Sequence, residues 1–120
     1  MAKRVPDASA LEELLTAERV STLRQIAALT RDWDGLVESS ADIGVDDEHD
    51  PEGATLAFER SQIDGLLSRA HEHLTDLDSA LEALRAGTYG TCERCGDPIA
   101  PERLTARPAA RTCIRCAAAR

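Results

Sequence analysis

The clearest pattern in the chain is an apolar stripe whose members recur in alternating steps of four and three residues. The members are Ile63, Leu67, Ala70, Leu74, Leu77, Leu81 and Leu84. Three heptads in unbroken register are typical of a coiled-coil seam. Gly87 follows the stripe and favours a helix end there, because glycine readily adopts the left-handed conformation that terminates helices. The pattern predicts a helix over about residues 55–86.

A less regular stripe precedes it and predicts another helix, over about residues 9–39. Its members are Leu11, Leu15, Val20, Leu23, Ile26, Trp33 and Val37. Most steps are of three or four residues, with a slip in phase near Val20. Ser9 and Glu12 have the spacing of a capping box, which favours a helix start at Ser9.

Neither predicted helix can bury its stripe alone. An antiparallel hairpin in which the two stripes face each other solves this within one chain, so we expect a monomer. An intermolecular coiled coil is the alternative, and light scattering separates the two. The connection, about residues 40–54, becomes the tip of the hairpin. Unstructured connections of that length are uncommon and are often functional.

The composition supports helices and excludes a membrane protein. The hydrophobic fraction is 42%, but aromatic residues make up only 2% of the chain, which is too few for a typical β-sandwich core. No apolar run approaches the ~20 residues that span a bilayer. The first residues lack the apolar stretch of a secretory signal, so we expect a cytoplasmic protein.

The net charge of −8 is concentrated in one segment, which includes most of the expected tip. Residues 32–52 contain nine acidic residues and no lysine or arginine. Asp50 can cap a helix that starts at Pro51, whereas Asp46, Asp47 and Glu48 have no such use. Clustered carboxylates repel one another, which favours a role toward a cation or a basic partner over a merely solvated loop. So acidic a chain is a poor candidate for binding a DNA sequence.

Four cysteines form two Cys-x-x-Cys pairs near the C-terminus: Cys92 with Cys95, and Cys113 with Cys116. Seventeen residues separate the pairs, a spacing typical of a four-cysteine zinc site. Four sulfurs fill the tetrahedral shell of Zn²⁺ and leave no position for substrate, so the predicted zinc ion is structural. A rubredoxin-like iron centre and thiol redox chemistry are the alternatives.

These patterns together predict a mainly α fold in two parts. An antiparallel helical hairpin, or coiled coil, occupies residues 1–86, and a small four-cysteine zinc finger with a short C-terminal helix occupies residues 87–120. No glycine-rich phosphate loop, Ser/His/Asp set or Cys/His nucleophile pair stands in the sequence, so we do not expect an enzyme.

A helical hairpin with an acidic tip, followed by such a finger, resembles the DksA/TraR family of bacterial transcription factors. The run from Gly87 to Ile99, with Pro101–Leu104 and the second cysteine pair, looks very much like the zinc finger of that family. The resemblance covers about residues 56–116, and the first helix by architecture alone.

The resemblance implies a function and a partner. Family members bind RNA polymerase, and their hairpin enters the secondary channel, where tip aspartates in an Asp-x-x-Asp-x-Ala pattern alter promoter complexes. Here Asp47 and Asp50 supply the two aspartates, Asp46 and Glu48 lie beside them, and Glu52 stands where the family has alanine. Some members act with the alarmone ppGpp in the stringent response, but no ppGpp-contacting set is matched residue by residue in this chain.

The competing hypothesis is a zinc-ribbon adaptor that binds another protein or a nucleic acid through the finger, with the hairpin as a spacer. Neutralising the tip carboxylates discriminates between the two. The change abolishes function if the tip acts on polymerase, and it leaves function intact if the finger alone binds the partner.

Overall fold

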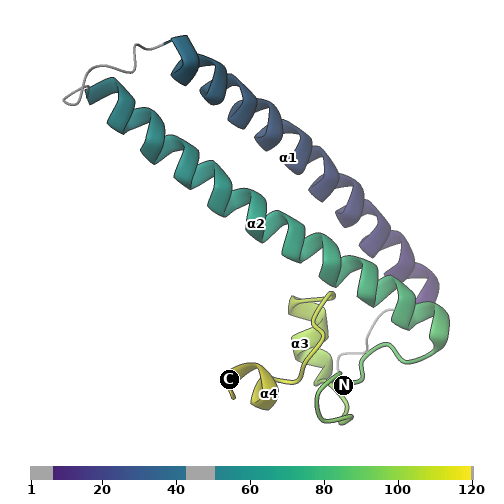
Figure 1. Cartoon of the computed structure of the whole chain (residues 1–120). Coiled ribbons are helices and arrows are strands. Elements are labelled where there is room, and N and C mark those ends of the chain that lie inside the picture. The colour runs from purple at the N-terminus through teal and green to yellow at the C-terminus, as the bar shows by residue number, and fades with distance from the viewer. Residues whose placement is uncertain (1–6, 43–50, 120) are drawn as a thin grey trace. The chain divides into compact units, whose positions relative to one another are not determined.

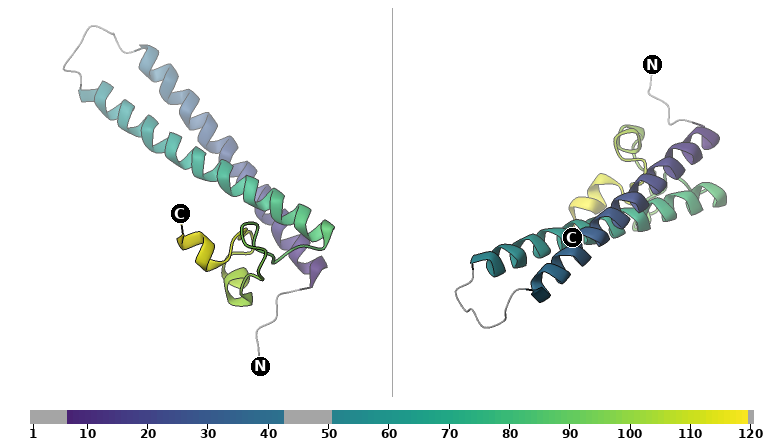
Figure 2. Two further views of the ribbon diagram at one scale, coloured as in Figure 1. Left: turned by 60° about the horizontal axis from the view of Figure 1, so that its bottom comes forward. Right: turned by 90° about the horizontal axis from the view of Figure 1, so that it is seen from above.

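Four helices make up the computed structural model, which describes residues 7–42 and 51–119. They are α1 (Ala8–Asp42), α2 (Pro51–Ala86), α3 (Pro101–Ala106) and α4 (Ile114–Ala118) (Figure 1). The long helices α1 and α2 run antiparallel, as the two further views in Figure 2 also show. The described residues contain one isolated β-bridge, between Thr91 and Pro98, and no strand. The prediction of a mainly α fold with a helical hairpin is therefore confirmed.

Both long helices extend beyond the predicted bounds. Asp7 caps α1, since its Oδ1 accepts a hydrogen bond from the N–H of Ala10 at 2.8 Å. The expected capping box at Ser9 and Glu12 is wrong, because the helix has already begun at Ala8. The segment between α1 and α2 is thus residues 43–50, shorter than expected, and it lies outside the described residues.

Gly87 ends α2 in the way that its position predicts. Its φ is 77°. The N–H of Gly87 donates to the carbonyl of Leu84 at 3.2 Å, and the N–H of Thr88 donates to that of Ala83 at 2.8 Å. This pair of bonds is the Schellman motif, which satisfies carbonyl groups that the end of a helix leaves without partners.

The chain divides into two compact units. We call residues 1–21 and 73–120 the finger-base unit, and residues 22–72 the distal hairpin unit. The finger-base unit contains one end of each long helix together with α3, α4 and the four cysteines. The distal hairpin unit contains only the remaining parts of α1 and α2.

The finger-base unit has two apolar clusters. The first joins the helices and consists of Leu15, Leu77, Ala80 and Leu81, with Leu84, Tyr89 and Ala109 packed against it. The second lies in the finger and consists of Cys92, Ile99, Leu104 and Cys113, with Tyr89, Ala110 and Cys116 packed against it. Tyr89 contacts both clusters, so the finger and the helix ends share one packed unit.

The predicted α2 seam is confirmed, because all seven of its positions are buried or half-buried. Gly53, Leu56 and Arg60 continue it toward the start of the helix in the same alternation of three and four residues. In the distal hairpin unit the guanidinium of Arg60 lies over the ring of Trp33, 5.7 Å from its centre. A cation over an aromatic face is attracted to it, so this polar seam residue has a favourable contact.

The predicted α1 seam is wrong in part. Leu11 and Leu15 are buried, but Val20, Leu23 and Val37 are 39–43% exposed. Thr22, 3% exposed, occupies the seam instead, followed by half-buried Ile26, Leu29, Trp33 and Leu36. The helix keeps its phase and places a polar residue inside, where an apolar-only pattern does not find it. Among the described helices, none is long and apolar enough to cross a membrane.

Candidate metal centre

The first cysteine pair lies in a tight turn that backbone hydrogen bonds hold at both ends. The N–H of Ile99 donates to the carbonyl of Gly90 at 2.7 Å, and the N–H of Cys92 to that of Asp97 at 2.8 Å. Gly96 has a φ of 78°, which a side chain would disfavour. Backbone geometry thus brings the two sulfurs of this pair to one side of the turn.

The second cysteine pair lies at the start of α4. Cys113 immediately precedes the helix and Cys116 belongs to it. The side chain of Arg94, from the first pair's turn, donates to the carbonyl groups of Cys116 at 3.3 Å and Ala119 at 3.1 Å. A cation at the carboxyl end of a helix is favourable, so Arg94 holds the two cysteine segments together.

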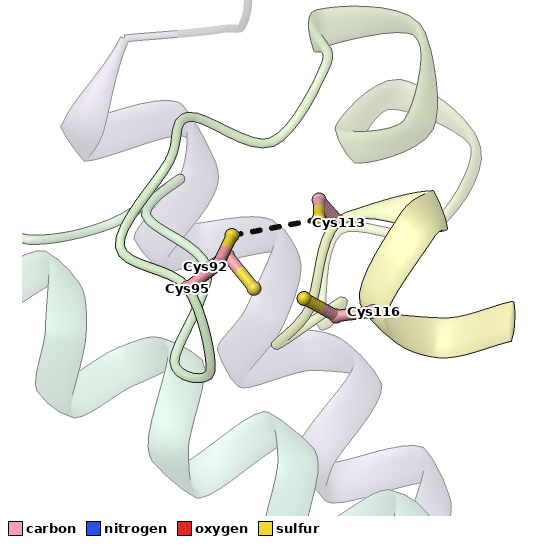
Figure 3. Close-up of side chains that lie close together, drawn as sticks. All are labelled: Cys92, Cys95, Cys113 and Cys116. Atoms are coloured by element: carbon pink, nitrogen blue, oxygen red, sulfur yellow. Dashed lines mark hydrogen bonds between the residues drawn. The ribbon is translucent and has the colours of Figure 1, made fainter. Parts of the chain in front are cut away.

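The four sulfurs converge on one point (Figure 3). All four Sγ atoms lie within 4.8 Å of one another, and those of Cys95 and Cys113 are 3.7 Å apart. Four sulfurs at ~2.3 Å from a tetrahedral zinc ion are separated by about 3.8 Å, so the cluster fits that ion. Cys92 and Cys113 are buried, Cys116 is half-buried, and Cys95 is exposed.

The thiols perturb one another strongly. Hydrogen bonds from the backbone, first that of Cys113, lower the pKa of Cys92 to about 6. Hydrogen bonding with the Cys113 thiol raises the pKa of Cys116 to about 12. Four sulfurs this close together can all be thiolates only with a cation between them, which a bound zinc ion supplies.

Arg111 joins the finger to α2. Its Nε donates to Glu93 Oε1 at 2.9 Å, and its Nη1 donates to Asp76 Oδ1 at 3.2 Å. These bonds, the one to Glu93 first, raise the pKa of the guanidinium. Sequence reasoning missed the Arg111 contacts, since no regular spacing in the sequence relates residues 76, 93 and 111.

Tyr89 makes a hydrogen bond within the finger. Its hydroxyl donates to the carbonyl of Pro108 at 2.8 Å, and burial raises the pKa of Tyr89.

Known proteins share both parts of this arrangement. Residues 87–120 match the family described as the prokaryotic dksA/traR C4-type zinc finger. Transcription factor DksA2 from Pseudomonas aeruginosa is similar at 30% identity and a TM-score of 0.51, over 95% of this chain and 88% of that one.

The chain belongs to the DksA/TraR family.

Two further matches support this membership. The DnaK suppressor protein from Agrobacterium tumefaciens C58 is 28% identical with a TM-score of 0.61, over 100% of this chain and 98% of that one. A curated protein from Aquifex aeolicus (strain VF5) is 40% identical over 62 residues. The chain spans 31–59% of the lengths of its curated relatives. The DksA/TraR finger and the clustered sulfurs together confirm the prediction of one structural zinc ion.

The predicted tip residues of this DksA/TraR protein are not part of the described structure. Asp46, Asp47, Glu48 and Asp50 lie outside the described residues, and Glu52 falls in α2 with its side chain outside them. Of the predicted site residues, the structure therefore brings together the four cysteines.

Proposed function

We propose that this chain regulates transcription in the cytoplasm by binding RNA polymerase, without catalysing a reaction of its own. The observation that carries the proposal is the likeness to transcription factor DksA2 over 95% of the chain, hairpin and finger together. A likeness confined to the finger would have supported an adaptor equally well.

The hairpin is the part that we propose to enter the secondary channel of the polymerase. A pair of antiparallel helices is narrow enough to enter a channel from which a globular domain is excluded. We infer that Asp47 and Asp50 act at its tip, with Asp46, Glu48 and Glu52 adding negative charge. Carboxylate oxygens are the ligands that Mg²⁺ prefers, so such a tip suits a magnesium-dependent active centre.

For the finger, we infer that Cys92, Cys95, Cys113 and Cys116 are the four zinc ligands. Their sulfurs would complete the coordination shell, which makes the ion a folding element and leaves no open position for chemistry. We place the boundary between the hairpin and the finger regions at residues 86 and 87, so that residues 87–120 dock on the outer surface of the polymerase.

The test is a multi-round transcription assay combined with a core-enzyme binding measurement on the same samples. The tip variant Asp47→Asn/Asp50→Asn is compared with Asp32→Asn/Asp34→Asn, which removes the same charge from exposed positions of α1. We expect all three proteins to bind. The wild type and the α1 variant shift the transcript level, and the tip variant leaves it unchanged.

Two other results have defined meanings. If none of the proteins binds polymerase, the proposed partner is wrong and the adaptor hypothesis replaces it. If the tip variant shifts transcription as the wild type does, the tip mechanism is wrong although the partner is correct. Repeating the assay with and without ppGpp tests whether ppGpp takes part. If it does, the wild-type protein shifts the transcript level further when ppGpp is present.

A further inference from the structure

Arg111 lies where three separate segments of the finger-base unit meet. Its side chain contacts Glu93, which lies between the first two cysteines, and Asp76 of α2. Its own carbonyl accepts a hydrogen bond from the N–H of Glu93 at 2.9 Å. Residues 93 and 111 are therefore joined twice, through backbone and side chain, and only the Asp76 contact reaches the hairpin.

The positions of Glu93 and Arg111 depend on the cysteine cluster. Glu93 follows Cys92 directly, and Arg111 precedes Cys113 by two residues. Besides cysteine, the second cluster buries only Ile99 and Leu104. So small an apolar core is insufficient to fold such a segment, and zinc binding supplies the remaining free energy. Loss of the metal is therefore expected to separate the two cysteine segments, after which Glu93 no longer holds Arg111 beside α2.

We propose that Arg111 makes docking of the finger on α2 depend on zinc, through the chain of contacts Glu93–Arg111–Asp76. The zinc ion then has a second role beyond folding the finger, since it also tightens the end of the hairpin. This inference is independent of polymerase binding and rests on zinc held by the four cysteines.

The contact is one of two components of the docking. Tyr89 and Ala109 also pack against the cluster of Leu15, Leu77, Ala80 and Leu81. That apolar contact adds to the docking without requiring any charge. The Arg111 and Asp76 side chains are 36% and 41% exposed, so solvent weakens their attraction. We therefore expect the ion pair to change the equilibrium constant for docking of the finger on α2 by a modest factor.

Asp78 provides a matched control. It lies on α2 two residues after Asp76, is 50% exposed, and pairs with Arg19 of α1 at 2.6 Å. Asp76→Ala and Asp78→Ala thus each remove one carboxylate and one ion pair from the same helix, with the same gain in helix propensity. Only the first substitution removes a contact with the finger.

The experiment measures amide hydrogen exchange along α2 in the full chain, zinc-loaded and after zinc removal by a chelator. In the wild type, zinc removal raises exchange over residues 74–81. In zinc-loaded Asp76→Ala, with zinc content and circular dichroism unchanged, exchange over these residues already rises toward the zinc-free value. Asp78→Ala keeps the full zinc-dependent protection of the wild type.

Zinc affinity supplies an independent readout. If zinc favours docking, docking favours zinc by the same factor. We expect Asp76→Ala, and Glu93→Gln on the finger side, to weaken zinc binding about two- to five-fold in competition with a chromophoric chelator, the range of a partly exposed ion pair. Zinc dependence and affinity in both variants equal to those of the wild type would overturn the proposal, as would an equal effect of Asp78→Ala.

Discussion

Leu15, Leu77 and Leu81 of the finger-base unit are 0–6% exposed, whereas Ile63 and Leu67 of the distal hairpin unit, at the same kind of seam position, are only half-buried. Among the described residues, the distal hairpin unit buries only Thr22 and Ala70 below one tenth exposure. Both units contain parts of α1 and α2, and the heptad pattern of α2 runs through both, so the pattern itself does not account for the difference.

A third layer accounts for it. In the finger-base unit, Tyr89 and Ala109 cover the helix pair and exclude water from the leucines between the helices. In the described part of the distal hairpin unit, residues 22–42 and 51–72, no such apolar cluster covers the seam, and Ile63 and Leu67 stay half-buried. Heptad register therefore decides which helix faces meet, while the burial of those faces depends on what covers them.

The largest expected effect comes from Cys92→Ser or Cys113→Ser. Either change removes a sulfur from the four-cysteine cluster and with it, on the proposal that these sulfurs hold zinc, the binding energy that folds the finger. We expect zinc to be absent and the finger to unfold, while most of the helical circular dichroism remains. An equal loss of helix and finger signals would contradict this expectation, because it would mean that the two units fold only together.

Truncation of seam leucines comes next. Leu77→Ala leaves a cavity at a position that is 1% exposed, so we expect it to lower the free energy of unfolding by about 2–5 kcal/mol. Leu67→Ala removes a half-buried side chain and should cost roughly half as much, because less apolar area is lost. Urea denaturation of both variants measures the difference, and equal losses would contradict it.

Alanine at Gly87 of the finger-base unit and at Gly35 of the distal hairpin unit should change stability in opposite directions. An added Cβ meets nothing within 4 Å at either Gly87 or Gly35, but only Gly87 has a positive φ. Gly87→Ala should lower stability by about 1 kcal/mol through backbone strain. Gly35→Ala should raise it by about 1 kcal/mol, because alanine favours the helix interior. Thermal melts of both variants test the signs.

The smallest effect is a pH dependence from Tyr89. Burial raises its pKa above the ordinary value of 10.0, so the folded state favours the neutral hydroxyl. Its contribution is complete below pH 10 and is lost as the pH rises through the folded-state pKa. Tyr89→Phe removes the bond to Pro108, costing about 1 kcal/mol at neutral pH. A stability profile from pH 9 to 11 should then be flatter than that of the wild type.

The sequence predicts the helical hairpin and the four-cysteine cluster because apolar residues and cysteines each recur at a fixed spacing. The α2 seam has one apolar residue at every expected step, and two Cys-x-x-Cys pairs have few other uses. In α1 the prediction fails where Thr22 lies inside and Leu23 outside. A threonine beside a leucine offers no hydrophobic reason to face inward, and its position follows from the seven-residue step that separates it from Leu15 and from Leu29.

The contacts of Arg111 could not be predicted from the sequence, for a different reason. Asp76, Glu93 and Arg111 are ordinary charged residues, and only the folded finger brings them together. Tyr89 gave a weak signal, as the only tyrosine in a chain with few aromatic residues. An aromatic residue alone does not mark a buried place, however, because Phe58 is 63% exposed.

The uninterrupted seam of α2 also restricts how the length of this protein can change over evolution. Seven residues inserted at matching places in both helices of the distal hairpin unit leave every seam position in register and add ~10 Å to each helix. An insertion of one or two residues in a single helix turns its apolar stripe toward water. The hairpin is therefore adjustable in paired steps of seven residues, while the finger and the helix ends that hold it stay unchanged.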